Sequence, residues 1–269
     1  MIEKRMPREM SPREISIEGT RIAYVESGAG HDILYVHGNT GSKRWFERVM
    51  EVPDCRTVAL DMPNFGGSAA LTGDPDIDRY ADFVVAFIKV LKIEKPVLVG
   101  HSLGGAVAIS TAVRTPGLLR GLVLVDSAAP SGLHTPPERY AAIEAMRTRR
   151  GILSAALGAV VPTLTDKAFF QALVDDAARM APSAWIGNAR ALSRFDCRGK
   201  CSAFPRPVLV IWGKKDVIVT EDMAQETAQA FPTARLVKLD HVGHSVVVED
   251  PQGFLRLLSD FVSEIGKGD

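Results

Sequence analysis

The most informative stretch of the chain is a serine set between glycines at the end of an apolar run. Residues 97–105 read VLVGHSLGG, with Gly100 and Gly104 two positions before and after Ser102. The apolar residues before the serine predict a buried strand, and those after it predict a helix. A serine at such a turn takes a strained backbone with positive φ, which presents its hydroxyl as a nucleophile. The N–H of Leu103 points to the same place. A purely structural turn is the alternative at this point.

A nucleophilic serine needs a general base and a carboxylate that orients this base. The carboxyl-terminal half offers both, each after a predicted strand. The apolar strand at 207–212 leads to Asp216, and the strand at 235–240 leads to His244. Open α/β sheets gather functional groups at the carboxyl ends of their strands. We therefore expect Asp216 and His244 to meet Ser102 at that edge.

Two other residues compete for these roles. Asp126 also ends a predicted strand and is the alternative to Asp216 as the acid. His241 is the nearest rival of His244, but it stands at the strand end rather than after the glycine of the loop. We therefore favour Asp216 and His244.

Five motifs in this order resemble the α/β-hydrolase fold superfamily over nearly the whole chain. Besides the serine turn, they are HGN at 37–39, DMPNFGGS at 61–68, GKKD at 213–216 and GH at 243–244. The order serine, acid, histidine is also found in this superfamily. The resemblance implies an α/β fold, with a mostly parallel twisted sheet flanked by helices. It also implies a catalytic triad of Ser102, Asp216 and His244, and an oxyanion hole made by the N–H groups of Asn39 and Leu103.

Strands and helices alternate around these motifs. After a hairpin at about 15–25, we expect strands near 32–36, 56–61, 96–100, 121–126, 207–212 and 234–240, and helices near 42–51, 77–92, 103–114, 221–230 and 252–264. Strands rich in valine and leucine suit a parallel sheet covered on both faces. The alternation stops between 129 and 204, where three or four helical segments follow one another. This block resembles the helical cap that many family members insert after the sixth sheet strand. We expect a core of residues 1–128 and 205–269 with a cap of residues 129–204.

Composition excludes several other classes of protein. The 269 residues suit one large α/β domain with an insertion. Lys and Arg total 32, as do Asp and Glu, so nothing favours nucleic acid as a partner. No apolar run is long enough for a membrane span, and residues 1–15 lack the apolar stretch of a signal peptide. Three cysteines argue for a reducing compartment, and we expect a cytoplasmic monomer or homodimer. No second pair of ligands follows Cys197 and Cys201 to complete a metal site.

The resemblance implies hydrolysis through an acyl-serine, with no metal or organic cofactor. A carboxylesterase-like enzyme that cleaves small or medium esters is our first interpretation. A C–C bond hydrolase, lactonase or thioesterase with the same triad, or a non-enzymatic ligand receptor on this fold, is the alternative. C–C hydrolases usually carry asparagine and tryptophan where this chain has His101 and Ser245. Serine at position 102 excludes haloalkane dehalogenases and epoxide hydrolases, which attack with a carboxylate. We expect His37 and His101 to be structural.

Overall fold

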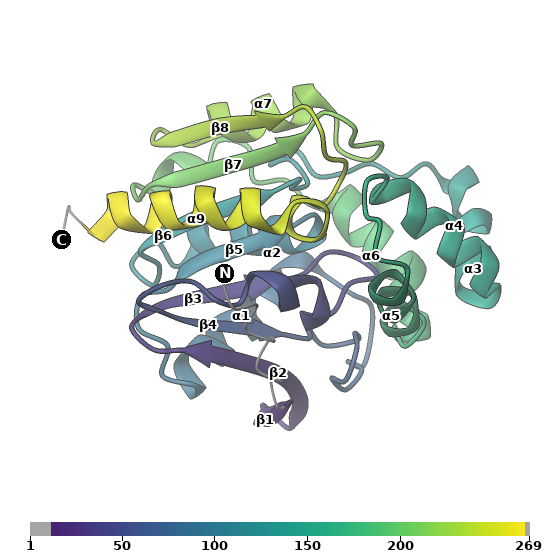
Figure 1. The fold of residues 1–269 in the computed structure, drawn as a ribbon. Coiled ribbons are helices and arrows are strands. Elements are labelled where there is room, and N and C mark those ends of the chain that lie inside the picture. Colours follow the sequence, from purple (N-terminus) through teal and green to yellow (C-terminus); the bar gives the residue numbers. More distant parts are fainter. Residues whose placement is uncertain (1–11, 267–269) are drawn as a thin grey trace, which may run out of the picture.

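The computed structural model describes residues 12–266, which build one eight-stranded sheet (Figure 1). The strand order is β1-β2-β4-β3-β5-β6-β7-β8. β2 pairs antiparallel with both β1 and β4, and the other neighbours are parallel. The strands are β1 (Arg13–Ile17), β2 (Thr20–Gly28), β3 (His31–Val36), β4 (Cys55–Leu60), β5 (Val97–His101), β6 (Gly121–Val125), β7 (Val208–Gly213) and β8 (Ala234–Leu239). The mostly parallel sheet predicted from the sequence is confirmed.

Helices cover both faces of this sheet. The α-helices are α1 (Ile77–Val90), α2 (Leu103–Arg114), α3 (Tyr140–Thr148), α4 (Arg150–Val160), α5 (Lys167–Ala177), α6 (Pro182–Arg194), α7 (Glu221–Ala230), α8 (Val246–Glu249) and α9 (Pro251–Gly266). Three short 3-10 helices are η1 (Lys43–Val49), η2 (Pro137–Arg139) and η3 (Cys201–Ala203). α1 and α2 pack together on one face, while α9 crosses the other face beside η1 (Figure 1). The helix expected near 42–51 is thus a 3-10 helix.

The central strands are buried on both faces, which explains their unbroken apolar sequences. Every residue of β5 and of β6 is buried. Such strands read as continuous runs of valine and leucine because helices exclude water from both sides. The strand ends, and not their middles, are therefore where polar side chains become available for chemistry.

Two glycines let α2 approach the sheet closely. A Cβ on Gly104 would lie 2.3 Å from the carbonyl oxygen of Val36, at the end of β3. A Cβ on Gly100 would lie 2.4 Å from the carbonyl oxygen of Gly104. Only glycine fits at these positions without moving backbone. The close packing brings the amino terminus of α2 to the carboxyl end of β3.

Helices α3 to α6 follow one another between β6 and β7 and lie together beyond one end of the sheet (Figure 1). We call these four helices and their connectors the helical insertion. A buried carboxylate joins it to η1 and to the residue just before that helix. Asp176 of α5 accepts hydrogen bonds from Ser42 Oγ and Arg44 Nε, both at 2.8 Å. The helical insertion is therefore attached to the core by buried polar contacts as well as by its two chain connections.

The chain ends follow the sequence predictions where the structure describes them. The hairpin predicted at about 15–25 is formed by β1 and β2, which turn at Glu18 and Gly19. Residues 1–11, which belong to the segment without the apolar stretch of a signal peptide, lie outside the described residues. Asp250 Oδ1 accepts the N–H of Gly253 at 2.9 Å, which caps α9 at its first residue, Pro251. Within residues 12–266, no helix combines the length and apolarity that crossing a membrane requires.

We expect Gly104→Ala to destabilise the protein. The added methyl group must displace the backbone of β3, and overpacking of this kind typically costs about 1–3 kcal/mol. Gly151→Ala is the control, because Gly151 is exposed in α4 and a Cβ there meets nothing within 4 Å. Urea unfolding should show a lower midpoint for Gly104→Ala and an equal or higher midpoint for Gly151→Ala. Equal midpoints for the two variants would contradict the close approach.

Candidate active site

Ser102 lies on the strained turn that the sequence predicts, between the end of β5 and the start of α2. Its φ is 54° and its ψ is −118°. The turn is secured by backbone hydrogen bonds: the N–H of Ser102 donates to Val125 O at 3.0 Å, and Ser102 O accepts the N–H groups of Gly105 and Ala128. A positive φ at a residue with a Cβ persists only where the surroundings enforce it. Ser102 is partly exposed at this turn.

Asp216 and His244 are brought together by the loops after β7 and β8. The Nδ1 of His244 donates to Asp216 Oδ2 at 2.7 Å, and the Asp216 side chain is fully buried. The second carboxylate oxygen accepts the N–H groups of Ile218 and Val219, at 2.7 and 3.0 Å. The carboxylate is thus fixed in one orientation. With Nδ1 used as a donor, Nε2 of His244 is the nitrogen left for proton transfer.

Two opposing effects act on His244. Burial lowers the pKa of the imidazole, but the hydrogen bond to Asp216 and the negative charges around the ring, those of Asp216 and Glu249 among them, outweigh it, so the pKa is raised. The rings of His244 and His101 are 5.1 Å apart between centroids, and His101 directly precedes the serine. His244 therefore lies beside the turn that carries Ser102.

The alternative acid and the alternative histidine are bonded elsewhere. Asp126 Oδ1 accepts the N–H of Gly213 at 2.9 Å, and its buried Oδ2 has no hydrogen-bond partner within residues 12–266. Burial raises the pKa of Asp126 to about 8, which favours its neutral form. His241 is exposed and bonds Asp250 at the start of α9, at 2.9 Å. Neither Asp126 nor His241 takes part in the hydrogen bond between Asp216 and His244.

His101 forms a hydrogen bond with the main chain of His244, in keeping with the structural role expected for it. Its Nε2 lies 2.8 Å from His244 O and 2.7 Å from Ser245 Oγ. Because one neighbour is a carbonyl oxygen, Nε2 carries the proton and donates. Burial lowers the pKa of His101 to about 3, so the ring is neutral. It stacks on Trp45 at 5.4 Å between centroids.

The turn after β3 lies directly against the serine. A Cβ on Gly38 would lie 2.8 Å from the Cβ of Ser102. Leu103 is the first residue of α2, where N–H groups have no partner within the helix. His37 secures this turn: its Nδ1 lies 2.8 Å from Gly38 O, and its Nε2 accepts the N–H of Met62 at 3.0 Å. Burial lowers the pKa of His37, consistent with a neutral, structural imidazole.

Sequence reasoning missed a residue of the helical insertion that contacts this turn. Asn188, in the middle of α6, is fully buried, and its Nδ2 donates to Asn39 Oδ1 at 2.9 Å. Its Oδ1 accepts from Tyr80 Oη at 3.0 Å, and Tyr80 Oη in turn accepts from Asn64 at 2.9 Å. The only sequence signal is a polar residue on the apolar face of a helix. It predicts a buried polar contact but not its partner.

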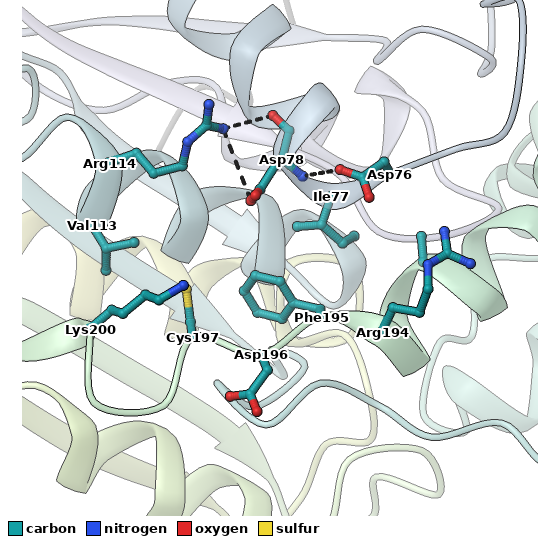
Figure 2. A pocket seen from close by; sticks show the side chains of 11 residues that line it. Asp76, Ile77, Asp78, Val113, Arg114, Arg194, Phe195, Asp196, Cys197 and Lys200 are labelled. Atoms are coloured by element: carbon teal, nitrogen blue, oxygen red, sulfur yellow. Dashed lines mark hydrogen bonds and ion pairs between the residues drawn. The ribbon is translucent and has the colours of Figure 1, made fainter.

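A small cavity lies away from these residues, between α1, α2 and the end of α6 (Figure 2). Its volume is about 160 Å³, and charged side chains of both signs line it, among them Asp78, Arg114 and Lys200. Figure 2 shows Arg114 bonded to Asp78, whose carbonyl oxygen it contacts at 2.9 Å. Cys197 also borders the cavity, and burial raises the pKa of its thiol to about 11. Within residues 12–266, no cluster of His, Cys, Asp and Glu could hold a metal ion.

Comparison with known proteins agrees with this fold. A 2-hydroxymuconate semialdehyde hydrolase of Pseudomonas sp. (strain CF600) is 28% identical over 272 residues, covering 94% of each protein. Among solved structures, an esterase from Exiguobacterium antarcticum superposes with a TM-score of 0.85 at 22% identity, over 93% of this chain and 98% of that chain. The enol-lactonase from Burkholderia xenovorans superposes with a TM-score of 0.84 at 21% identity, over 93% of this chain and 100% of that chain. Residues 33–257 match the model of the alpha/beta hydrolase family, and the chain belongs to that family.

Proposed function

We propose that this protein is a serine hydrolase that cleaves small or medium carboxylic esters through an acyl-serine intermediate. The observation that carries the proposal is the hydrogen bond between His244 and the buried Asp216, beside the strained turn of Ser102. A histidine oriented in this way serves as a general base for an adjacent hydroxyl. We assign Ser102 as nucleophile, His244 as base and Asp216 as the acid that orients it.

The reaction proceeds in two halves. As Ser102 Oγ attacks the ester carbonyl, His244 Nε2 takes its proton, and Asp216 stabilises the imidazolium. The N–H groups of Asn39 and Leu103 donate to the developing oxyanion, each contributing about 3 kcal/mol in the transition state. The carbon–oxygen bond to the alcohol breaks, and the alcohol leaves with the proton from His244. Water then attacks the acyl-serine with His244 as base, which releases the acid and restores Ser102.

We propose that residues 129–204 form a cap over this site, with residues 1–128 and 205–269 as the core. Two contacts support this role. Asn188 of α6 bonds Asn39 in the proposed oxyanion turn, and the N–H of His244 donates to Val160 O at 2.9 Å. A cover of this kind excludes water and shapes the pocket for the acyl group.

Two alternatives with the same triad have specific support. The 28% identical relative is named as a 2-hydroxymuconate semialdehyde hydrolase, which favours a C–C bond hydrolase as the second candidate. The likeness to the enol-lactonase keeps lactones among the esters to be tested. A series of aryl esters of increasing acyl length, with thioesters, lactones and a ring-cleavage product alongside, separates these possibilities. The highest kcat/KM identifies the substrate class.

Ser102→Ala should abolish hydrolysis of a p-nitrophenyl ester and leave the fold intact. Loss of a serine nucleophile lowers kcat by about 10⁶-fold, because the acyl intermediate cannot form. Initial rates and the circular dichroism spectrum measure the two effects. Ser131→Ala is the control, since Ser131 is exposed and bonds Glu226 away from the triad. Unchanged turnover in Ser102→Ala would end the proposal.

Asp216→Asn should be far more damaging than Asp126→Asn. The amide at 216 no longer stabilises the imidazolium and favours the wrong tautomer, at a cost of about 10⁴-fold in kcat. Asp126 is mainly neutral at pH 7, since its pKa lies at about 8, so an amide of the same shape replaces it at little cost. Steady-state kinetics of both variants at pH 7 make the comparison. A greater loss of kcat in Asp126→Asn would identify Asp126, which follows β6, as the acid instead.

The activity should decline on the acid side with a midpoint above pH 6.5. The His244 pKa is raised from its ordinary value of 6.5, so the protonated, inactive imidazole persists to a higher pH than for a free histidine. Below the midpoint, kcat/KM should fall about tenfold per pH unit, as for loss of one essential base. A profile that stays flat down to pH 5 would rule out His244 as the base.

A further inference from the structure

Glu249, the last residue of α8, contacts both neighbours of the catalytic histidine. Its Oε1 accepts the N–H of Gly243 at 2.9 Å and the N–H of Ser245 at 3.2 Å. Its Oε2 accepts the N–H of Thr163 at 3.1 Å and the Thr163 hydroxyl at 2.6 Å. Thr163 lies in the connector between α4 and α5, residues 161–166. One carboxylate therefore joins the His244 loop to the helical insertion.

The helical insertion also meets the His244 loop directly, through the end of α4 and through the connector. The N–H of His244 donates to Val160 O at 2.9 Å, at the end of α4. Pro162 packs so closely on Gly243 that a Cβ there would lie 2.5 Å from the proline Cδ. All three consecutive N–H groups at 243–245 thus form hydrogen bonds. Those of Gly243 and Ser245 donate to Glu249, and that of His244 donates to the helical insertion. The carbonyl oxygen of His244 is occupied too, by His101.

The hydrogen bonds of Glu249 do more than satisfy a buried carboxylate, because they help to hold the backbone around His244 in place. The His244 main chain is secured by three separate elements: the end of β5, α8 and the helical insertion. Displacement of the end of α4 together with the connector removes the hydrogen bonds of Val160 and Thr163 at once, so that the His244 loop loses its contacts on this side. A small displacement of a catalytic group is costly, up to about 10²-fold in rate per ångström.

We propose that Glu249 is a positioning residue that couples the seating of the helical insertion to the placement of His244. This inference rests on the proposed function, in which His244 is the general base. The coupling means that His244 is correctly placed only when the connector at 161–166 packs against the His244 loop and bonds Glu249. Glu249 acts on the reaction through His244 and does not itself touch the substrate.

Glu249 acts through both its charge and its hydrogen bonds, and two variants separate them. The charged and titratable groups facing His244 are Asp216, Asp126, Glu249 and the neutral His101. The negative charge of Glu249 is one of the causes that raise the His244 pKa. Glu249→Gln removes this charge and weakens the hydrogen bonds, whereas Thr163→Val removes only the hydroxyl contact.

The matched control is Glu226→Gln. Glu226 of α7 likewise accepts an N–H and a hydroxyl from one residue, Ser131, at 3.0 and 2.8 Å, where the chain leaves the sheet. It makes the same kind of contact without touching the His244 loop. Thr163→Ser is a rescue variant, because it keeps the hydroxyl that Thr163→Val removes.

With a p-nitrophenyl ester, Thr163→Val should lower kcat by about tenfold or more, with KM and the acid midpoint unchanged. Glu249→Gln should lower kcat at least as much and also shift the acid midpoint to lower pH. Thr163→Ser and Glu226→Gln should behave as the unaltered protein. Wild-type kcat and an unshifted midpoint in Glu249→Gln would overturn the proposal, as would equal effects of Glu226→Gln.

A second measurement does not depend on turnover. In the Ser102→Ala protein, NMR titration of the His244 imidazole should give a lower pKa when Glu249→Gln is added. Amide hydrogen exchange of His244 should accelerate with Thr163→Val but not with Glu226→Gln. If the protein hydrolyses no ester, the proposed function fails while these two readouts still test the coupling. Unaltered titration and exchange would disprove it.

Discussion

The hydrogen bond between His244 and Asp216 depends on how closely two neighbouring loops can approach. β7 and β8 are parallel neighbours, with Gly213 paired to Leu239 at their carboxyl ends. A Cβ on Gly213 would lie 2.1 Å from the carbonyl oxygen of Gly243, so only glycine lets the acid loop and the histidine loop meet. Both carboxylate oxygens of Asp216 are then engaged, and the imidazole has a single orientation. The remaining parts of the site are arranged around this oriented ring.

The helical insertion directly contacts several parts of the proposed site. It contacts the proposed oxyanion turn through Asn188, the histidine loop through Val160 and Thr163, and the loop before η1 through Asp176. Each contact satisfies polar groups that are wholly or partly buried, and leaving such groups without partners is costly. Substitutions in the insertion are therefore expected to alter both substrate selection and the placement of the reacting groups.

The features predicted correctly from the sequence have local causes. The glycines flanking Ser102 and the apolar strands that end in polar loops are each recognised from a few adjacent residues. The contacts of Asn188 with Asn39 and of Glu249 with Thr163 could not be predicted, because these partners lie 149 and 86 residues away along the chain. The choice between Asp126 and Asp216 depends in the same way on tertiary structure. Both aspartates follow strands, and only the packed sheet determines which one reaches His244.

The central claim is that Ser102 carries the acyl group between the two half-reactions. Rapid acid quenching of the protein during turnover of a p-nitrophenyl ester, followed by peptide mass spectrometry, tests it most directly. We predict a mass increase equal to the acyl group on the peptide that contains Ser102, with none on other peptides. An acyl group on a different residue, or turnover with no acylated peptide at any quench time, would contradict the account.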